Sequence, residues 1–127
     1  MKGWTPIFVM LSVAVIAAAV VPWHDFQGHT HWGKVTWLPF VSGPLRLRDV
    51  VANVLLFVPL GAAVARGSST HHMIRNATLV GAGVSLVGEW AQVYSHSRFP
   101  SATDLVNNMC GAVLAASTVR AWRRRWE

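Results

Sequence analysis

Acidic and amide side chains recur in pairs within otherwise apolar segments of the chain. Asp49 and Asn53 are four positions apart, and Asp104 and Asn108 repeat this arrangement. Residues four apart share one face of a helix, so each pair would present a carboxyl and an amide group together. Carboxylates can exchange protons or bind hard cations, and amides can orient a polar ligand. The repeat therefore predicts a polar site to which at least two helices contribute.

A further apolar segment contains Glu89, with Gln92 three positions later on the same helix face. An ionisable side chain inside a membrane span is costly unless it faces the protein interior or a wet cavity, which favours a functional role. We interpret Glu89 as a general acid or base. Arg98, in the loop that follows, and Arg48 carry guanidinium groups, which suit the binding of phosphate.

These side chains are expected to lie in one layer. At 1.5 Å per residue, Asn53 and Asn108 would lie about 6 Å inside the start of their helices, and Glu89 about 7 Å before the end of its own. The predicted catalytic residues are Glu89, Asp104 and Asp49. The predicted substrate-binding residues are Arg98, Asn53, Asn108, Gln92 and Arg48.

Structural interpretations of the same residues stay open. The segment from Ser101 to Asp104 fits a capping box, and Asp49 would be favoured at a helix N-terminus by the helix dipole. Asn53 and Asn108 could form hydrogen bonds between helices without any chemistry. Glu89 is the residue for which a purely structural role is hardest to argue.

The composition favours an all-α integral membrane bundle. Of the 127 residues, 53% are hydrophobic and 13% are charged, whereas soluble domains have charged residues at about a quarter of their positions. The net charge of +6 is carried mostly by short connections and the C-terminal tail, so no nucleic-acid partner is predicted. The chain is expected to be a single domain, 1–127.

Four apolar segments predict four transmembrane helices. Their expected ranges are 5–22, 49–65, 77–94 and 104–122, and the range 23–48 is expected to form an outer loop. The first segment also resembles a signal peptide; its length favours a retained helix, with cleavage as the alternative. Lys and Arg residues divide seven against four between the two sides, which predicts that both termini are cytoplasmic.

Five short motifs, in this order and spacing, resemble the VanZ-like family. They are Trp37-Leu38-Pro39-Phe40, Asp49-x3-Asn53-x3-Phe57-x-Pro59-x-Gly61, Glu89-x2-Gln92, Arg98, and Asp104-x3-Asn108-x2-Gly111. The resemblance covers roughly residues 37–116 and implies a multi-pass protein of the bacterial inner membrane. The family's namesake is associated with teicoplanin resistance. One departure is that Thr103 precedes Asp104, where the family often has a second acid.

The resemblance and the polar residues together indicate a protein that acts on or binds a cell-envelope lipid, a lipid-linked precursor or a glycopeptide. The alternatives are a non-enzymatic protein whose polar layer only holds the bundle together, and a small transporter. The sequence decides neither whether the protein is an enzyme nor its oligomeric state. His24, His29, His31 and His96 could ligate Zn²⁺, but we interpret them as solvated loop residues, and no metal or cofactor is predicted.

Overall fold

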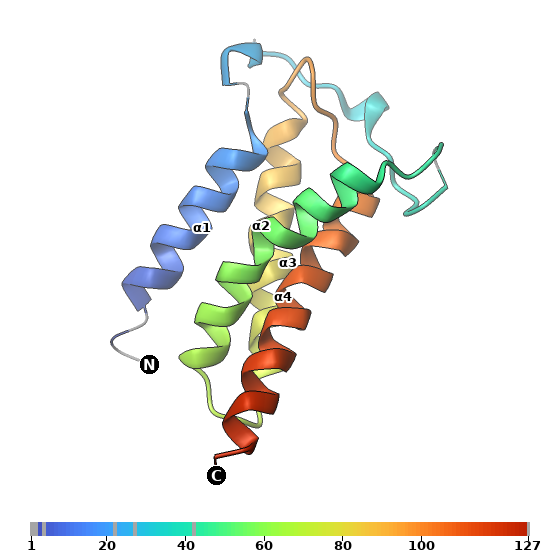
Figure 1. Cartoon of the computed structure of the whole chain (residues 1–127). Helices are drawn as coiled ribbons and strands as arrows, with labels where there is room; N and C mark the ends of the chain where they lie inside the picture. The colour runs from blue at the N-terminus through green and yellow to red at the C-terminus, as the bar shows by residue number, and fades with distance from the viewer. Residues whose placement is uncertain (1–2, 4, 22, 27, 42, 127) are drawn as a thin grey trace.

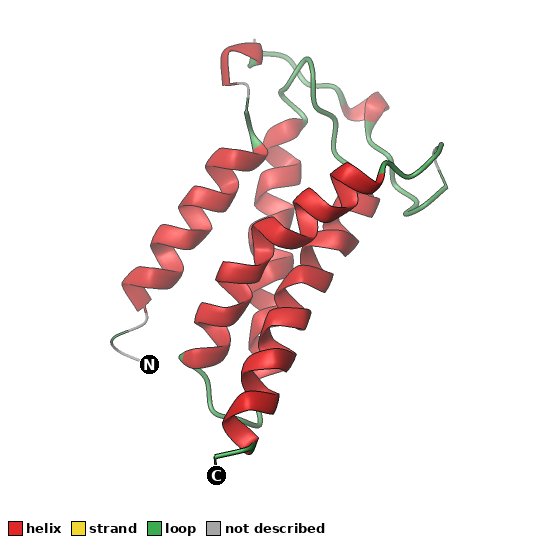
Figure 2. Ribbon diagram, in the orientation of Figure 1, coloured by secondary structure: helices red, strands yellow, loops and turns green. Residues whose placement is uncertain are grey.

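The computed structural model describes residues 3, 5–21, 23–26, 28–41 and 43–126. This part of the chain is all-α (Figures 1 and 2). The α-helices are α1 (Thr5–Ala19), α2 (Leu47–Arg66), α3 (Met73–Gln92) and α4 (Ala102–Arg124). Two short 3-10 helices, η1 (Trp23–Asp25) and η2 (Trp32–Lys34), interrupt the segment between α1 and α2.

The tightest contact in the bundle joins α2 and α4, where glycines bring two backbones together. A Cβ on Gly61 would overlap the backbone of Ala112, and one on Gly111 would overlap the carbonyl of Val54. Small residues at helix interfaces allow such close approach. α1 packs on α2 and α3 and lies apart from α4 (Figure 1).

The core between the helices is apolar. It is formed by nine buried residues, which are Val15, Phe57, Leu60, Val64, Ala65, Met73, Ala77, Ala112 and Ala116. These side chains pack closely against one another, and this packing sets the relative positions of α2, α3 and α4.

The two ends of the bundle differ. The start of α1, the end of α4 and the connection between α2 and α3 lie at one end in Figure 1, and the α1–α2 and α3–α4 connections lie at the other. These two connections are joined by isolated bridges, Phe26 with Ser95 and Thr36 with Ser101. The α1–α2 segment, expected as an outer loop, is therefore attached to the end of the bundle that carries the polar residues.

The helices differ from the expected ranges mainly at their ends. α2 and α4 each begin two residues earlier than expected and extend one or two residues further, whereas α3 is displaced toward the N-terminus and α1 ends at Ala19. The expected bounds follow the apolar residues alone. The backbone hydrogen bonds of a helix continue through polar residues such as Arg75 and Asn76, so the observed bounds differ. Pro22, the expected end of the first helix, and Lys2, which counts in the charge asymmetry, lie outside the described residues.

Among the described helices, α2 alone is both long and apolar enough to cross a membrane by length and composition. α1 is apolar but has 15 residues, about 22 Å at 1.5 Å per residue. α3 and α4 have 20 and 23 residues, which is sufficient length for a core of about 30 Å, but polar side chains lower their hydropathy.

Candidate functional site

Two adjoining cavities, of about 220 and 540 Å³, open at the end of the bundle where α1 leads into the outer loop. We call them together the polar cavity. Four polar residues line both cavities, namely Asn53, Gln92, Arg98 and Asp104. Glu89 and Asn108 line the smaller one, and Arg48 and Asp49 the larger one. The structure thus brings all eight predicted site residues to one place.

Asp104 and Asn53 connect α4 to α2 directly. The amide nitrogen Nδ2 of Asn53 donates a hydrogen bond of 2.7 Å to Oδ1 of Asp104. The two i, i+4 pairs predicted from sequence therefore meet across the α2–α4 contact, with the carboxylate of one pair facing the amide of the other.

Glu89 contributes to the N-terminal cap of α4. Ser101 is the N-cap residue of that helix, and its hydroxyl accepts the N–H of Thr103 at 3.2 Å. In a capping box, an acid three positions after the cap would accept the N–H of the cap residue. Here Oε2 of Glu89 accepts the N–H of Ser101 at 2.7 Å, which leaves Asp104 to bind Asn53.

The two buried amides of the polar cavity, Asn108 and Gln92, each make one hydrogen bond to a neighbouring element. Nδ2 of Asn108 donates to Oγ of Ser85 at 2.9 Å, and Nε2 of Gln92 donates to the carbonyl of Ala19 at 2.8 Å. Their oxygens, Oδ1 of Asn108 and Oε1 of Gln92, are buried and have no partner among the described residues. A buried acceptor without a partner is costly, so these oxygens are suited to accept a bond from a ligand or a water molecule.

Arginines supply the positive charge of the polar cavity. Arg98 is half-buried and lies close enough to Glu89 and Asp104 to interact electrostatically with both. Its backbone N–H donates to Oγ of Ser95 at 3.2 Å, so the loop holds it independently of its side chain. Arg48 forms an exposed ion pair with Asp49 at 3.6 Å, which contributes little to stability because solvent screens it.

An apolar groove of about 290 Å³ lies beside the polar cavity. It runs between α3, the start of α4 and the outer loop, and its apolar walls include Trp32, Trp37, Trp90 and Leu105. Glu89 lines this groove as well as the smaller part of the polar cavity. The carboxyl group therefore stands between an apolar space and a polar one.

A family model described as VanZ/LLP1 matches residues 5–123, nearly the whole chain. The chain belongs to the VanZ/LLP1 family. The resemblance drawn from the short motifs is thereby confirmed, and proteins of the VanZ/LLP1 family are membrane proteins. No curated protein and no solved structure matches the chain.

The structure explains how this VanZ/LLP1 chain uses Thr103, the residue before Asp104. Oγ1 of Thr103 accepts the N–H of Phe40 at 2.9 Å. Phe40 has a φ of 62°, a left-handed conformation that is unusual for a bulky side chain. The hydroxyl at position 103 thus holds a strained turn of the outer loop against α4.

Sequence reasoning missed how two serines enter the site of this VanZ/LLP1 fold. Ser85 is the partner of Asn108, and Ser101 is the partner of Glu89. Arg46 also lines the larger part of the polar cavity. No spacing signal could have revealed Ser85, because its partner comes from another helix. The capping-box pattern did mark Ser101, but assigned its partner to Asp104.

A second group of titratable side chains lies on the loops of this VanZ/LLP1 chain. The rings of His29, His31 and His96 are neighbours; His29 is exposed, as expected for a solvated loop residue, and His31 and His96 are partly buried. Partial burial lowers the pKa of His96 below its ordinary value, and the charges of His29, His31 and Lys34 act in the same direction. The carboxylate of Asp25 acts in the opposite direction.

Proposed function

We propose that all four helices lie in the membrane, with both termini in the cytoplasm and the polar cavity open to the outer side. The helices expose large apolar side chains, among them Val51, Leu55, Leu79, Leu86 and Leu114. Such a surface is unusual for a water-soluble monomer and suits contact with lipid. Many of the polar residues that lower the hydropathy of α3 and α4 are buried inside the bundle, such as Gln92, Asn107 and Asn108.

At this cavity the protein binds, and acts on, a phosphate-bearing lipid or lipid-linked precursor of the cell envelope. The observation that carries the proposal is the position of Glu89, which lines both the apolar groove and the polar cavity. An amphiphile could lay its hydrocarbon chain in the groove and direct its head group past Glu89 toward Arg98. A site for a small polar solute would not need the apolar half.

The side chains have separate roles in this proposal. Arg98 and Arg48 bind the phosphate, since guanidinium groups match its geometry. Glu89 is the general acid or base, and Asp104 or Asp49 is the second acid–base group. The amides of Asn53, Asn108 and Gln92 orient the head group through their hydrogen-bonding atoms.

Binding of a polyprenyl phosphate to the purified protein in detergent tests the proposal, with the uncharged polyprenol of equal length as the reference lipid. The wild type should bind the phosphate more tightly than the alcohol. Arg98→Gln should weaken binding of the phosphate about tenfold or more, because a hydrogen bond to a charged group is worth about 1.5–3 kcal/mol. Binding of the alcohol should change little.

Arg75→Gln is the matched control. Arg75 is exposed on the first turns of α3, at the opposite end of the bundle, and its guanidinium contacts Asn76. It should bind both lipids as the wild type does. Equal binding of phosphate and alcohol by the wild type, or equal losses in the two arginine variants, would contradict the proposal.

A second candidate function is purely structural: the polar layer only holds the bundle together. The hydrogen bonds from Asn53 to Asp104 and from Asn108 to Ser85 favour it. Thermal stability in detergent separates the two. If Glu89→Gln, Asp49→Asn and Asp104→Asn all lower the melting temperature and none affects lipid binding alone, the layer is structural. A transport path has less support, because the core beyond the polar layer is apolar.

A further inference from the structure

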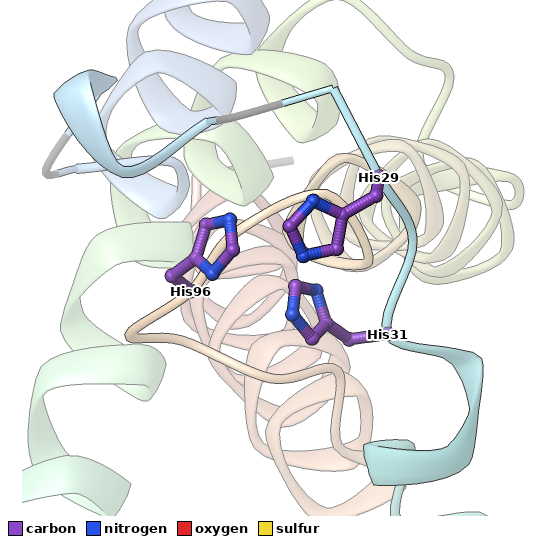
Figure 3. A group of neighbouring side chains, drawn as sticks. All are labelled: His29, His31 and His96. Atoms are coloured by element: carbon purple, nitrogen blue, oxygen red, sulfur yellow. The ribbon is translucent and has the colours of Figure 1, made fainter.

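Three imidazole rings meet where the outer loop touches the α3–α4 connection. His29 and His31 come from the outer loop, and His96 comes from the connection, and in Figure 3 their rings lie next to one another. The ring centroids are 4.8 Å apart for His29 and His31, 4.5 Å for His29 and His96, and 4.7 Å for His31 and His96. One nitrogen from each ring lies within 4.8 Å of the other two.

Two of the nitrogens in this cluster have unfulfilled bonding capacity. Nδ1 of His31 and Nε2 of His96 are shielded from solvent and have no hydrogen-bond partner within the part of the chain that the structure describes. A buried polar atom without a partner needs an explanation, and a bound ion is one of the usual ones. His29 is exposed, which leaves a route by which an ion could reach the cluster.

The backbone holds both segments in place independently of the rings. The N–H of His31 donates to the carbonyl of Val93 at 2.8 Å, and the N–H of His96 donates to the carbonyl of Asp25 at 3.3 Å. The bridge between Phe26 and Ser95 lies beside them. The ligand-bearing segments are therefore already docked, and side-chain rotations alone would bring the three nitrogens closer.

We propose that His29, His31 and His96 bind one Zn²⁺ ion, which joins the outer loop to the α3–α4 connection. Imidazole is a preferred ligand of zinc, and three protein ligands leave a fourth tetrahedral position for water. With Zn–N bonds of about 2.0–2.1 Å, the nitrogens of a tetrahedral site are about 3.3 Å apart, so nitrogens that lie within 4.8 Å of one another need to approach by at most about 1.5 Å. This site goes beyond the proposed function and does not depend on lipid binding.

Calorimetric titration of the tag-free, full-length protein with ZnCl₂ in detergent, after treatment with a chelator, tests the site. The wild type should bind one ion per chain. His29→Ala, His31→Ala and His96→Ala should each weaken binding by more than the roughly 10–100-fold that loss of an outer-sphere partner costs. His71→Ala is the control, because His71 is an exposed residue of the α2–α3 connection at the opposite end.

Circular dichroism establishes that the variants fold, and His31→Gln and His96→Gln replace any alanine variant that does not. Binding of Co²⁺ tests the site in the wild type without any variant. Co²⁺ in a tetrahedral site absorbs intensely in the visible range, and competition by Zn²⁺ should abolish this absorption. The proposal is overturned if the wild type binds no Zn²⁺, if two of the three histidine variants bind it as the wild type does, or if His71→Ala loses as much affinity as they do.

Discussion

Glu89 has two contacts that matter at the scale of single residues. Its Oε2 accepts the N–H of Ser101 and so completes the N-terminal cap of α4. The same side chain lines both the apolar groove and the polar cavity. The bond to Ser101 holds the carboxyl group of Glu89 in one orientation at the cavity wall. A general acid or base needs such fixed positioning.

Glu89→Gln separates these two contacts. The amide oxygen of glutamine can still accept the N–H of Ser101, so helicity and melting temperature should stay close to the wild type. The variant cannot exchange a proton as a carboxylate does, so it should bind polyprenyl phosphate but fail to complement a strain that lacks the gene. Full complementation by a correctly inserted Glu89→Gln variant would remove Glu89 from the catalytic set.

At the scale of elements, the site depends on how closely α2 approaches α4. The bond from Asn53 to Asp104 spans this contact near its outer end, and Gly111 lies against Val54, the next residue after Asn53. The backbone approach that glycine allows is therefore a condition for the polar contact. A side chain at position 111 would push the two halves of the polar cavity apart.

Gly111→Ala should consequently destabilise the bundle. The added Cβ would overlap the backbone carbonyl of Val54, which cannot rotate away as a side chain can. Overpacking costs about 1–3 kcal/mol, and the upper end applies here because the obstacle is backbone. The gain in helix propensity of about 1 kcal/mol offsets part of it, which leaves a net loss of about 2 kcal/mol. Reversible unfolding in mixed micelles measures it.

Gly83→Ala is the control for this substitution, because a Cβ on Gly83 meets nothing within 4 Å. It should leave the stability unchanged or raise it slightly through helix propensity. If both alanine variants are equally stable, the close contact of α2 and α4 at Gly111 does not exist in the folded protein.

The elements also show what the sequence could predict. The four helices follow from apolar segments, and the contact between α2 and α4 at the polar layer follows from two i, i+4 pairs placed at equal depth. The start of α3 at Met73 could not be predicted from hydropathy, because the helix continues through the polar residues Arg75 and Asn76. The sequence raised the loop histidines as possible metal ligands but could not show that His29, His31 and His96 meet, because this depends on which loops dock together and no local pattern encodes it.

The whole molecule is asymmetric from end to end. The polar cavity and the histidine cluster lie at one end, and the start of α1 and the end of α4 lie at the other with the α2–α3 connection (Figure 1). Several of the basic residues lie at this second end, including Arg123, whose guanidinium binds the carbonyls of Ser68 and Arg66. The excess of basic residues on one side is what the positive-inside rule associates with the cytoplasm.

Reporter fusions test this orientation. A fluorescent protein fused after residue 127 should fluoresce, because it folds in the cytoplasm, whereas alkaline phosphatase inserted after Gly43 should be active, because it requires the outer side. The exposed position of Gly43 in the outer loop makes it suitable for an insertion. The reverse pattern of activities would place the polar cavity in the cytoplasm.

Photolabelling tests whether a lipid phosphate occupies the polar cavity with its chain in the adjoining groove. A photoreactive polyprenyl phosphate is added to the protein in membranes, and the labelled residues are identified by mass spectrometry. We predict labels on the groove residues Trp37, Trp90 and Leu105, competed by unlabelled polyprenyl phosphate more than by polyprenol and reduced in Arg98→Gln. Labels confined to the outer surface of α4 around Met109 and Leu114, with no difference between the two competitors, would contradict this proposal.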